Sequence, residues 1–171
     1  QSHWFHLGRL VVSVSGGPTL LSWSATMFEY LMPLLVMRSF PQTLLDESCR
    51  AVVRRHVDYA ATRNVPWGIS ESAYATVDRH GTYQYRAFGV PGLGLKRGLG
   101  DALVVAPYAS ALAAVYAPAA VVANLRQLDA LGLTSPYGFL EAIDYSQPDA
   151  ETGAPDATGV VVANCMAHHQ G

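Results

Sequence analysis

The stretch from Pro41 to Arg63 reads PQTLLDESCRAVVRRHVDYAATR, and it decides the predicted fold. Apolar side chains recur along it at helical spacing and form one stripe, while most charged side chains lie outside that stripe. The stripe consists of Leu44, Leu45, Cys49, Val52, Val53, Val57 and Ala60. Asn64 follows and is a residue type that closes helices. The stretch therefore predicts an amphipathic helix with one side in a hydrophobic core.

Helical patterns also lie on both sides of this stretch. The predicted helices outside it are 22–37, 107–117, 118–131, 137–145 and 160–169. The stretch 102–123 carries no charge and is long enough to span a membrane, but Pro107 and Pro118 interrupt it. Two packed alanine-rich helices are the better interpretation, because proline fits the first turn of a helix. One short strand is predicted at 83–86 beside these helices, so the predicted fold class is mainly all-α.

The overall composition favours a folded domain and narrows the range of partners. Half of the 171 residues are hydrophobic and 14% are charged, which is enough apolar surface for a core and argues against disorder. The formal net charge is -2, with acidic and basic residues well mixed, so neither nucleic acid nor an anionic membrane surface is an expected partner. Cys49 and Cys165 are far apart and lack metal-binding spacing, so both are predicted to be free, packed thiols.

Three of the thirteen acidic residues have unusual surroundings. Glu29, Glu71 and Glu141 each lie among apolar or aromatic neighbours, whereas most of the other acids lie beside arginines or in a polar loop. Burial among such neighbours raises the pKa of a carboxyl group. Glycosyl chemistry uses a pair of carboxyl groups, so these three are candidates for that class of reaction.

Each of these acids also has a structural interpretation. Glu71 follows a Pro-Trp-Gly turn and Ser70, which is able to cap a following helix, so Glu71 is either a general acid/base or a cap for the N–H groups of residues 72–74. Glu29 either pairs with an arginine such as Arg38 or Arg97, or binds substrate. For Glu141 and for Asp144, structural pairing is the favoured interpretation, with substrate binding by Glu141 as the alternative.

Aromatic side chains are crowded near these acids and provide possible sugar platforms. Sugars have flat apolar faces that stack on aromatic rings, although packing in the core competes for the same side chains. The expected substrate-binding residues of this kind, together with the glutamine between two of them, are Trp23, Trp67, Tyr83, Gln84 and Tyr85.

Two further motifs have weaker implications. The glycine-rich segment 92–98 lacks the ending of a phosphate-binding loop, so no nucleotide site is predicted there. Lys96 and Arg97 within it either position a carboxylate or phosphate or form surface ion pairs. His168 and His169 are adjacent and point in different directions on a helix, which favours structural hydrogen bonding over a shared metal.

Several long strings resemble the glycoamylase-like domain of bacterial cyclic β-1,2-glucan synthases. They cover nearly the whole chain and are therefore more specific than any single motif. The strings are His3-Trp4-Phe5, LLSWSATMFEYLMPLLVMRSF (20–40), TLLDESCRAVVRRHVDYA (43–60), VPWGISESAY (65–74), YQYRAFGVPGLGLKRGL (83–99), VVAPYASALA (104–113), YGFLEAIDY (137–145) and MAHHQG (166–171).

The resemblance implies both a fold and a reaction. It implies an incomplete (α/α)6 barrel, or toroid, with a short β element around residues 82–87, in which 1–171 is a single partial domain truncated at both ends. Domains of this family cleave linear β-1,2-glucan and join it to its own far end, closing a ring, while related domains hydrolyse β-1,2-glucan. The family's acid/base glutamate falls in the Gly-Ile-Ser-Glu-Ser string, which implies Glu71. Its nucleophile lies on a helix upstream of His3.

Retaining transglycosylation is therefore the leading hypothesis for function. The alternatives are a β-1,2-glucan hydrolase and a non-catalytic fragment that holds glucan through Trp23, Trp67 and Tyr85. No metal, nucleotide or organic cofactor is predicted, because carboxyl groups suffice for proton transfer and covalent capture. The implied partners are β-1,2-glucan and the other domains of a multidomain synthase, without nucleic acid. The resemblance also implies a soluble segment of a bacterial, inner-membrane-associated protein, with no direct membrane contact of its own.

Overall fold

The computed structural model of the protein describes residues 8, 10–147 and 158–170, which excludes the His3-Trp4-Phe5 string. Of the described residues, 36% are helical and 22% lie in strands. The prediction of a mainly all-α fold, an incomplete (α/α)6 barrel, is therefore wrong for this chain, because the fold is mixed. Several segments with a helix-like pattern pair as strands with partners far along the sequence, and a local pattern does not reveal such pairing.

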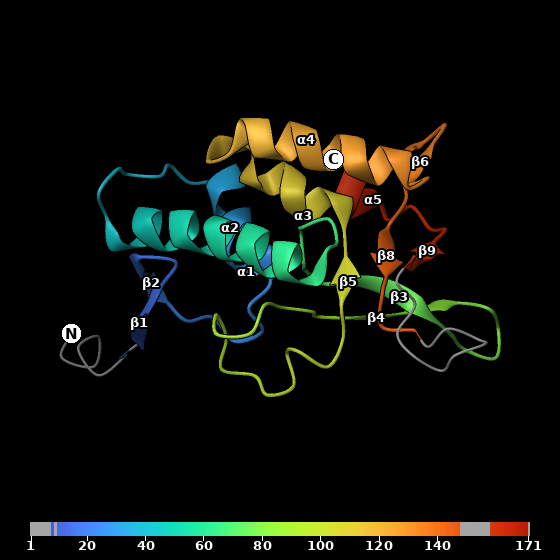
Figure 1. Ribbon diagram of the computed structural model, residues 1–171, viewed down its shortest axis with the longest axis horizontal. Helices are drawn as coiled ribbons and strands as arrows, with labels where there is room; N and C mark the ends of the chain where they lie inside the picture. Colours follow the sequence, from blue (N-terminus) through green and yellow to red (C-terminus); the bar gives the residue numbers. More distant parts are fainter. Residues whose placement is uncertain (1–7, 9, 148–157, 171) are drawn as a thin grey trace.

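The longer helices form one layer of the molecule. In Figure 1, α4 (Pro118–Ala130) lies over α3 (Pro107–Leu112), and α2 (Leu44–Arg63) runs beneath them. A 3-10 turn, η3 (Ala113–Val115), leads from α3 toward α4. The predicted helices 41–63, 107–117 and 118–131 are confirmed within a few residues at their ends.

The ends of α2 follow from its capping residues. The side chain of Thr43 accepts a hydrogen bond from the backbone N–H of Asp46, which sets the start of the helix three residues later than predicted. Asn64 ends the helix in the left-handed conformation, with φ of 55°. The remaining helical elements are short: α1 (Met27–Leu31), η2 (Met32–Leu35) and α5 (Ala167–Gln170).

Most of the small antiparallel sheets and the long loops lie on the other side of the molecule, while β6 lies at the end of α4 (Figure 1). The strands are β1 (Val11–Val14), β2 (Gly17–Leu20), β3 (Ser72–Val77), β4 (Tyr83–Arg86), β5 (Val104–Val105), β6 (Thr134–Ser135), β7 (Gly138–Phe139), β8 (Ala142–Asp144) and β9 (Val160–Val162). The pairs are β1–β2, β3–β4 and β6–β7, and a three-stranded sheet has the order β5–β8–β9. The predicted strand at 83–86 is confirmed as β4.

Three of the predicted helices differ from the observed elements. The helix predicted at 22–37 begins at Met27, because Thr26 caps α1 and Ala25 has a positive φ of 58°. The segment 137–145 contains β7 and β8 where a helical turn was predicted, and β8 is the central strand of its sheet. The helix predicted from Val160 begins at Ala167, because three consecutive β-branched valines form β9 instead.

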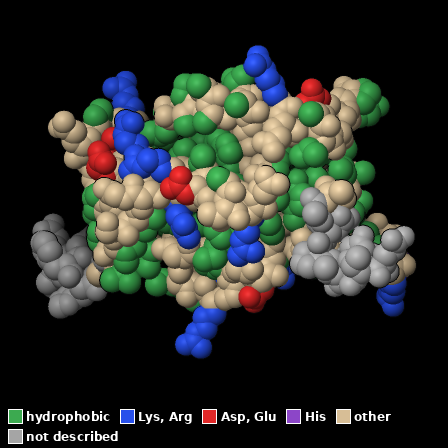
Figure 2. Space-filling model, in the orientation of Figure 1, with side chains coloured by type: hydrophobic (Ala, Val, Ile, Leu, Met, Phe, Trp, Pro, Cys, Tyr) green, Lys and Arg blue, Asp and Glu red, His purple; other side chains and the backbone are tan. Residues whose placement is uncertain are grey.

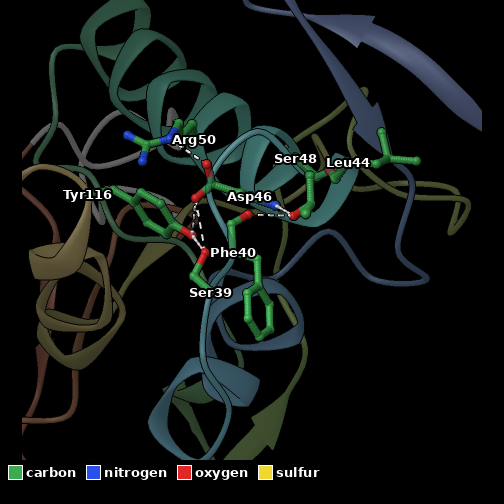
Figure 3. Close-up of polar contacts among 8 residues, drawn as sticks. Ser39, Phe40, Leu44, Asp46, Ser48, Arg50 and Tyr116 are labelled. Atoms are coloured by element: carbon green, nitrogen blue, oxygen red, sulfur yellow. Dashed lines mark hydrogen bonds and ion pairs between the residues drawn. The ribbon is translucent and has the colours of Figure 1, made fainter.

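The buried carboxylate of Asp46 connects separate parts of the helical layer by hydrogen bonds. Figure 3 shows Asp46 of α2 between Ser39 and Tyr116 on one side and Arg50 on the other. Asp46 accepts hydrogen bonds from Ser39 Oγ at 3.0 Å, from the Tyr116 hydroxyl at 3.1 Å and from Arg50 Nε at 3.0 Å. The Arg50 contact is the main reason that the pKa of Asp46 is lowered. The segment before α2 and the residue after η3 are thus joined to one side chain.

A continuous apolar core connects the helical layer to the sheets. Buried side chains from every part of the described fold contribute to it, for example Leu31, Val52, Leu93, Leu128 and Ile143. Each such side chain stabilises the fold by about 1.5–3 kcal/mol relative to an exposed one. Cys49 is buried and free as predicted, whereas Cys165 is free but exposed, so its predicted packing is wrong.

The described part of the chain contains no helix that is both long enough and apolar enough to cross a membrane. The uncharged stretch is instead divided between β5, α3, η3 and α4. On the face drawn in Figure 2, Lys and Arg side chains are spread among large hydrophobic areas and form no continuous basic stripe.

Candidate active site

The segment that carries Glu71 is fixed from several sides. It lies between the end of α2 and the start of β3, and the Ile69 N–H donates to Nδ1 of the buried His56 at 3.4 Å. The Gly68 carbonyl accepts from the Ala106 N–H at 2.9 Å. Gly68 has a φ of 120°, and a side chain there would lie 3.1 Å from the Ala106 carbonyl oxygen, so glycine suits this close approach.

Ser70 caps a helix, but not the predicted one. No helix follows Glu71, because the next element is β3. The Ser70 Oγ instead accepts a hydrogen bond from the backbone N–H of Phe28, in the first turn of α1, at 3.1 Å. The interpretation of Glu71 as a cap for the N–H groups of residues 72–74 is therefore wrong, and the start of α1 is attached directly to the residue before Glu71.

The Glu71 carboxyl group is half-buried, and its pKa is raised above the ordinary value. Burial is the main cause, and the nearby carboxylate of Glu29 is the second. The imidazoles of His169 and His168 act in the opposite direction. A carboxyl group with a raised pKa holds its proton at a higher pH, which is the requirement for a general acid.

The Glu29 carboxylate is held by residues that shortly precede it in the sequence, and not by an arginine. Its carboxylate accepts from Ser22 Oγ at 2.8 Å and from the backbone N–H groups of Ser24 at 3.0 Å and Thr26 at 3.3 Å. With the Thr26 side chain it completes a capping box at the start of α1. Among the described residues it forms no ion pair, so the proposed pairing with Arg38 or Arg97 is wrong.

Glu141 is fully buried and paired. Its oxygens accept a hydrogen bond from the Ala73 N–H at 3.0 Å and lie 3.0 Å from His169 Nδ1. Asp144 likewise accepts from the Ala75 N–H at 3.0 Å, and from Ser146 and Gln147. The predicted structural pairing is confirmed for Glu141, which pairs with His169, whereas Asp144 is held by hydrogen bonds and forms no ion pair among the described residues. Each acid holds β3 by one backbone N–H, so β3 is fixed relative to β8.

Tyr108 and His169 complete the surroundings of Glu71. The Tyr108 hydroxyl lies 2.8 Å from the Glu71 carbonyl oxygen and 2.9 Å from Ser70 Oγ, and it donates toward both. The His169 ring stacks on the Tyr108 ring at 3.7 Å and 11°, and Tyr85 lies beside it at 6.3 Å. The predicted structural hydrogen bonding of the histidine pair is confirmed for His169.

Sequence reasoning missed Tyr108 because it lies in an alanine-rich helix whose letters suggest only packing. Its signal was the one aromatic side chain of α3, directly after Pro107.

The predicted aromatic platforms differ in exposure. The side chains of Trp23 and Tyr85 are 65% and 44% exposed, and their faces are available to a ligand. Tyr83 and Gln84 are half-buried on β4. Trp67 is 7% exposed and packs in the core, so its ring offers little surface for a sugar.

The Glycoamylase family model, which carries the description "Putative glucoamylase", matches residues 1–171. The chain belongs to the Glycoamylase family. The family resemblance seen in the sequence is thereby confirmed.

One relative of this family member is the cyclic beta-(1,2)-glucan synthase NdvB of Rhizobium meliloti (strain 1021). The two are 44% identical over 169 residues, which is 99% of this chain and 6% of the synthase. The chain therefore spans a small part of the length of that relative.

Solved structures show a related fold at low identity. A "putative glucoamylase" from Bacteroides caccae ATCC 43185 matches with a TM-score of 0.56 and 16% identity over 95% of this chain and 38% of that one. An endo-beta-1,2-glucanase from Chitinophaga pinensis, in complex with sophorotriose and glucose, matches with a TM-score of 0.55 and 14% identity over the same shares.

Around the candidate site, this Glycoamylase-family chain has a pocket of about 400 Å³. Tyr108, Glu141 and His169 line one part of it, and mostly apolar side chains such as Leu35 and Leu125 line the rest, while Glu71 lies outside this lining. In the described residues no group of three His, Cys, Asp or Glu side chains has the arrangement of a metal site.

Lys96 and Arg97 have a separate location. They line a pocket of about 210 Å³ together with Arg86, and Lys96 Nζ donates to the Ala87 carbonyl at 3.2 Å. The surface ion pairs suggested for these two side chains are absent from the described residues.

Proposed function

We propose that this chain is part of an enzyme that acts on β-1,2-glucan by retaining transglycosylation, with Glu71 as the acid/base. The observation that carries the proposal is the half-buried Glu71 carboxyl group, whose pKa is raised and whose backbone is fixed by Tyr108. The substrate is proposed from the 44% identity to a cyclic beta-(1,2)-glucan synthase. The endo-beta-1,2-glucanase with a similar fold acts on the same class of glucan.

The proposed reaction has two proton transfers at one carboxyl group. Protonated Glu71 donates its proton to the glycosidic oxygen as the bond to the anomeric carbon breaks and a nucleophilic carboxylate captures that carbon. Glu71, now ionised, then takes the proton of an incoming glucan hydroxyl, which displaces the carboxylate and restores the starting configuration. When the hydroxyl belongs to the same glucan chain, the product is a ring.

The nucleophile is expected in a segment that precedes His3. Within the described part of the chain, Glu29 and Glu141 are the other carboxylates near Glu71. Glu29, Tyr83, Gln84 and Tyr85 are proposed to contact the glucan, together with the exposed ring of Trp23. The burial of Trp67 favours a packing role for that residue.

Hydrolysis is the second candidate reaction, because water in place of the glucan hydroxyl needs the same two carboxyl groups. To test this, the full-length protein carrying this chain is incubated with linear β-1,2-glucan, and the masses of the products are measured by mass spectrometry. Transglycosylation to rings gives products one water lighter than linear glucans of equal length. Shorter linear products alone mean hydrolysis.

The same assay tests Glu71. Glu71→Gln is expected to lower the rate by at least roughly 100-fold, as is typical of a lost general acid. Glu47→Gln is a matched control, because Glu47 lies on α2 and belongs to none of the contacts of the site. On an aryl β-sophoroside, whose phenolate leaves without protonation, added azide should restore turnover of the Glu71 variant and give a glycosyl azide of retained configuration, whereas a nucleophile variant gives the inverted azide. Activity of Glu71→Gln equal to that of the parent rejects the assignment.

Binding without chemistry is the third possibility. Glucan binding that persists in Glu71→Gln, together with no turnover by the parent protein, would establish the chain as a glucan-holding segment instead.

A further inference from the structure

The side chain of Tyr108 holds both Ser70 and Glu71 by its hydroxyl group. The Tyr108 hydroxyl contacts the carbonyl oxygen of Glu71 and the Oγ of Ser70, at 2.8 and 2.9 Å. Ser70 is fixed on its other side by the Phe28 N–H. A displacement of the Tyr108 ring therefore moves the Glu71 backbone, and with it the direction of the carboxyl group.

Tyr108 is in turn held by a buried pair. Its ring lies nearly parallel to the His169 ring at 3.7 Å, and His169 Nδ1 contacts both oxygens of Glu141 at 3.0 Å. The side chains of His169 and Glu141 are 3% and 0% exposed, so neither moves freely in solvent. Glu141 also accepts the Ala73 N–H, two residues after Glu71.

These contacts form a closed loop around Glu71. The loop runs from Ser70 and Glu71 through Tyr108, His169 and Glu141 and back to Ala73. Its members come from four segments that are far apart in the sequence. Catalytic groups need support of this kind, because a misplacement of about 1 Å costs up to about 100-fold in rate.

We propose that Tyr108 is the positioning residue for Glu71 and that His169, bound to Glu141, is the support that fixes Tyr108. The inference rests on the proposed acid/base role of Glu71. Tyr108 itself transfers no proton to substrate, since its hydroxyl is occupied by Ser70 and Glu71.

The test is Tyr108→Phe in the full-length protein, which removes one oxygen atom and keeps the ring that stacks on His169. We expect kcat to fall roughly 10- to 100-fold with little change in KM, because positioning affects the transition state more than substrate binding. In a Glu71→Gln background the same substitution should have no further effect. Tyr145→Phe is the matched control, since Tyr145 is also buried and its hydroxyl takes part in none of the contacts of the loop around Glu71.

A substrate with an activated leaving group separates positioning from a general structural role. An aryl β-sophoroside with a strongly acidic phenol needs little proton donation, so the Tyr108→Phe defect should shrink on that substrate. An equal defect on both substrates, or an added defect in the Glu71→Gln background, overturns the inference. An unchanged kcat of Tyr108→Phe on glucan also overturns the inference.

A second variant keeps the test decisive if Tyr108→Phe does not fold. His169→Phe keeps a ring for stacking but loses the Glu141 contact, and it should lower kcat on glucan more than on the aryl substrate. If His169→Phe lowers kcat equally on glucan and on the aryl substrate, His169 does not support Tyr108 as proposed. If Glu71→Gln is inactive while Tyr108→Phe and His169→Phe are normal, this inference fails alone. If Glu71→Gln remains active, the proposed function itself fails.

Discussion

At the scale of single residues, Glu71 is in surroundings that disfavour its charge. Burial and the neighbouring Glu29 carboxylate both raise the pKa of Glu71 in the folded protein, while the unfolded chain keeps the ordinary value. Below that ordinary value both states are protonated, and Glu71 has no effect on stability. As the pH rises through the raised pKa, the unfolded state has already lost its proton, and the folded state is destabilised relative to it.

Glu71→Gln is therefore expected to raise the melting temperature at pH 7 while it removes activity. The neutral amide has no charge to desolvate, so the gain should disappear at pH 4, where the parent carboxyl group is protonated too. Thermal unfolding of parent and variant at both pH values measures this difference, with Glu47→Gln as the control. A variant less stable than the parent at pH 7 would mean that the surroundings favour the ionised carboxylate.

The candidate residues were predictable to different degrees. Glu71, Glu141 and Tyr85 stand out because acids and aromatics are crowded in glycine- and proline-rich segments, and the structure brings these three together. Tyr108 does not stand out, and His169 stands out only as part of an adjacent histidine pair, because the importance of both lies in contacts across long sequence separations. Neither the stacking of two rings nor the shared carboxylate leaves a periodic pattern.

At the scale of elements, His56 connects α2 to the segment that carries Glu71. His56 is fully buried, and its Nδ1 accepts the Ile69 N–H. Burial is the main reason that the pKa of His56 is lowered to about 3. The unfolded chain takes up a proton near pH 6.5, whereas the folded protein does not, so stability is full above that value and is lost as the pH falls toward 3.

The expected loss approaches about 1.4 kcal/mol per pH unit between pH 6 and pH 4, which is the linkage slope for one proton. Urea unfolding at pH 7, 6 and 5 measures it, and His56→Gln should show a slope smaller by one proton because glutamine does not titrate. Equal slopes for parent and variant would show that His56 is protonated in the folded protein. At pH 7 the difference in unfolding free energy between the parent and His56→Gln measures the packing cost of the substitution.

The elements themselves were predicted where local rules suffice. The stripe and the capping residue Asn64 specify α2, and two prolines in first turns specify α3 and α4. The strand β8 was missed because burial on both faces removes the alternating pattern of an exposed strand. Ala142, Ile143 and Asp144 are all buried, so their letters resemble those of a buried helix.

At the scale of the whole molecule, one feature of the surface is unusual. Several large apolar side chains protrude from the end of η2, from the segment before α2 and from the first turn of α2, and we call them the η2 ridge: Leu35, Val36, Met37, Phe40 and Leu45. Val36 is 83% exposed, and Met37, Phe40 and Leu45 also line a pocket of about 340 Å³. Apolar areas of this kind are usually covered by another surface. The matched part of the two solved structures is 38% of each chain, which leaves more than half of each as possible cover.

We therefore expect the η2 ridge to be covered by the remainder of the glucoamylase-like domain in the full-length protein. The double variant Leu35→Ser/Val36→Ser should leave the melting temperature of the 171-residue chain almost unchanged, because both side chains are already exposed there. In the full-length protein it should cost roughly 3–6 kcal/mol, since two buried aliphatic side chains are lost. Urea unfolding of both proteins gives the comparison, and binding of a hydrophobic dye to the short chain should fall in the variant. An equal, small effect in both proteins would mean that the ridge faces solvent or a different partner, because covered side chains contribute to stability and exposed ones do not.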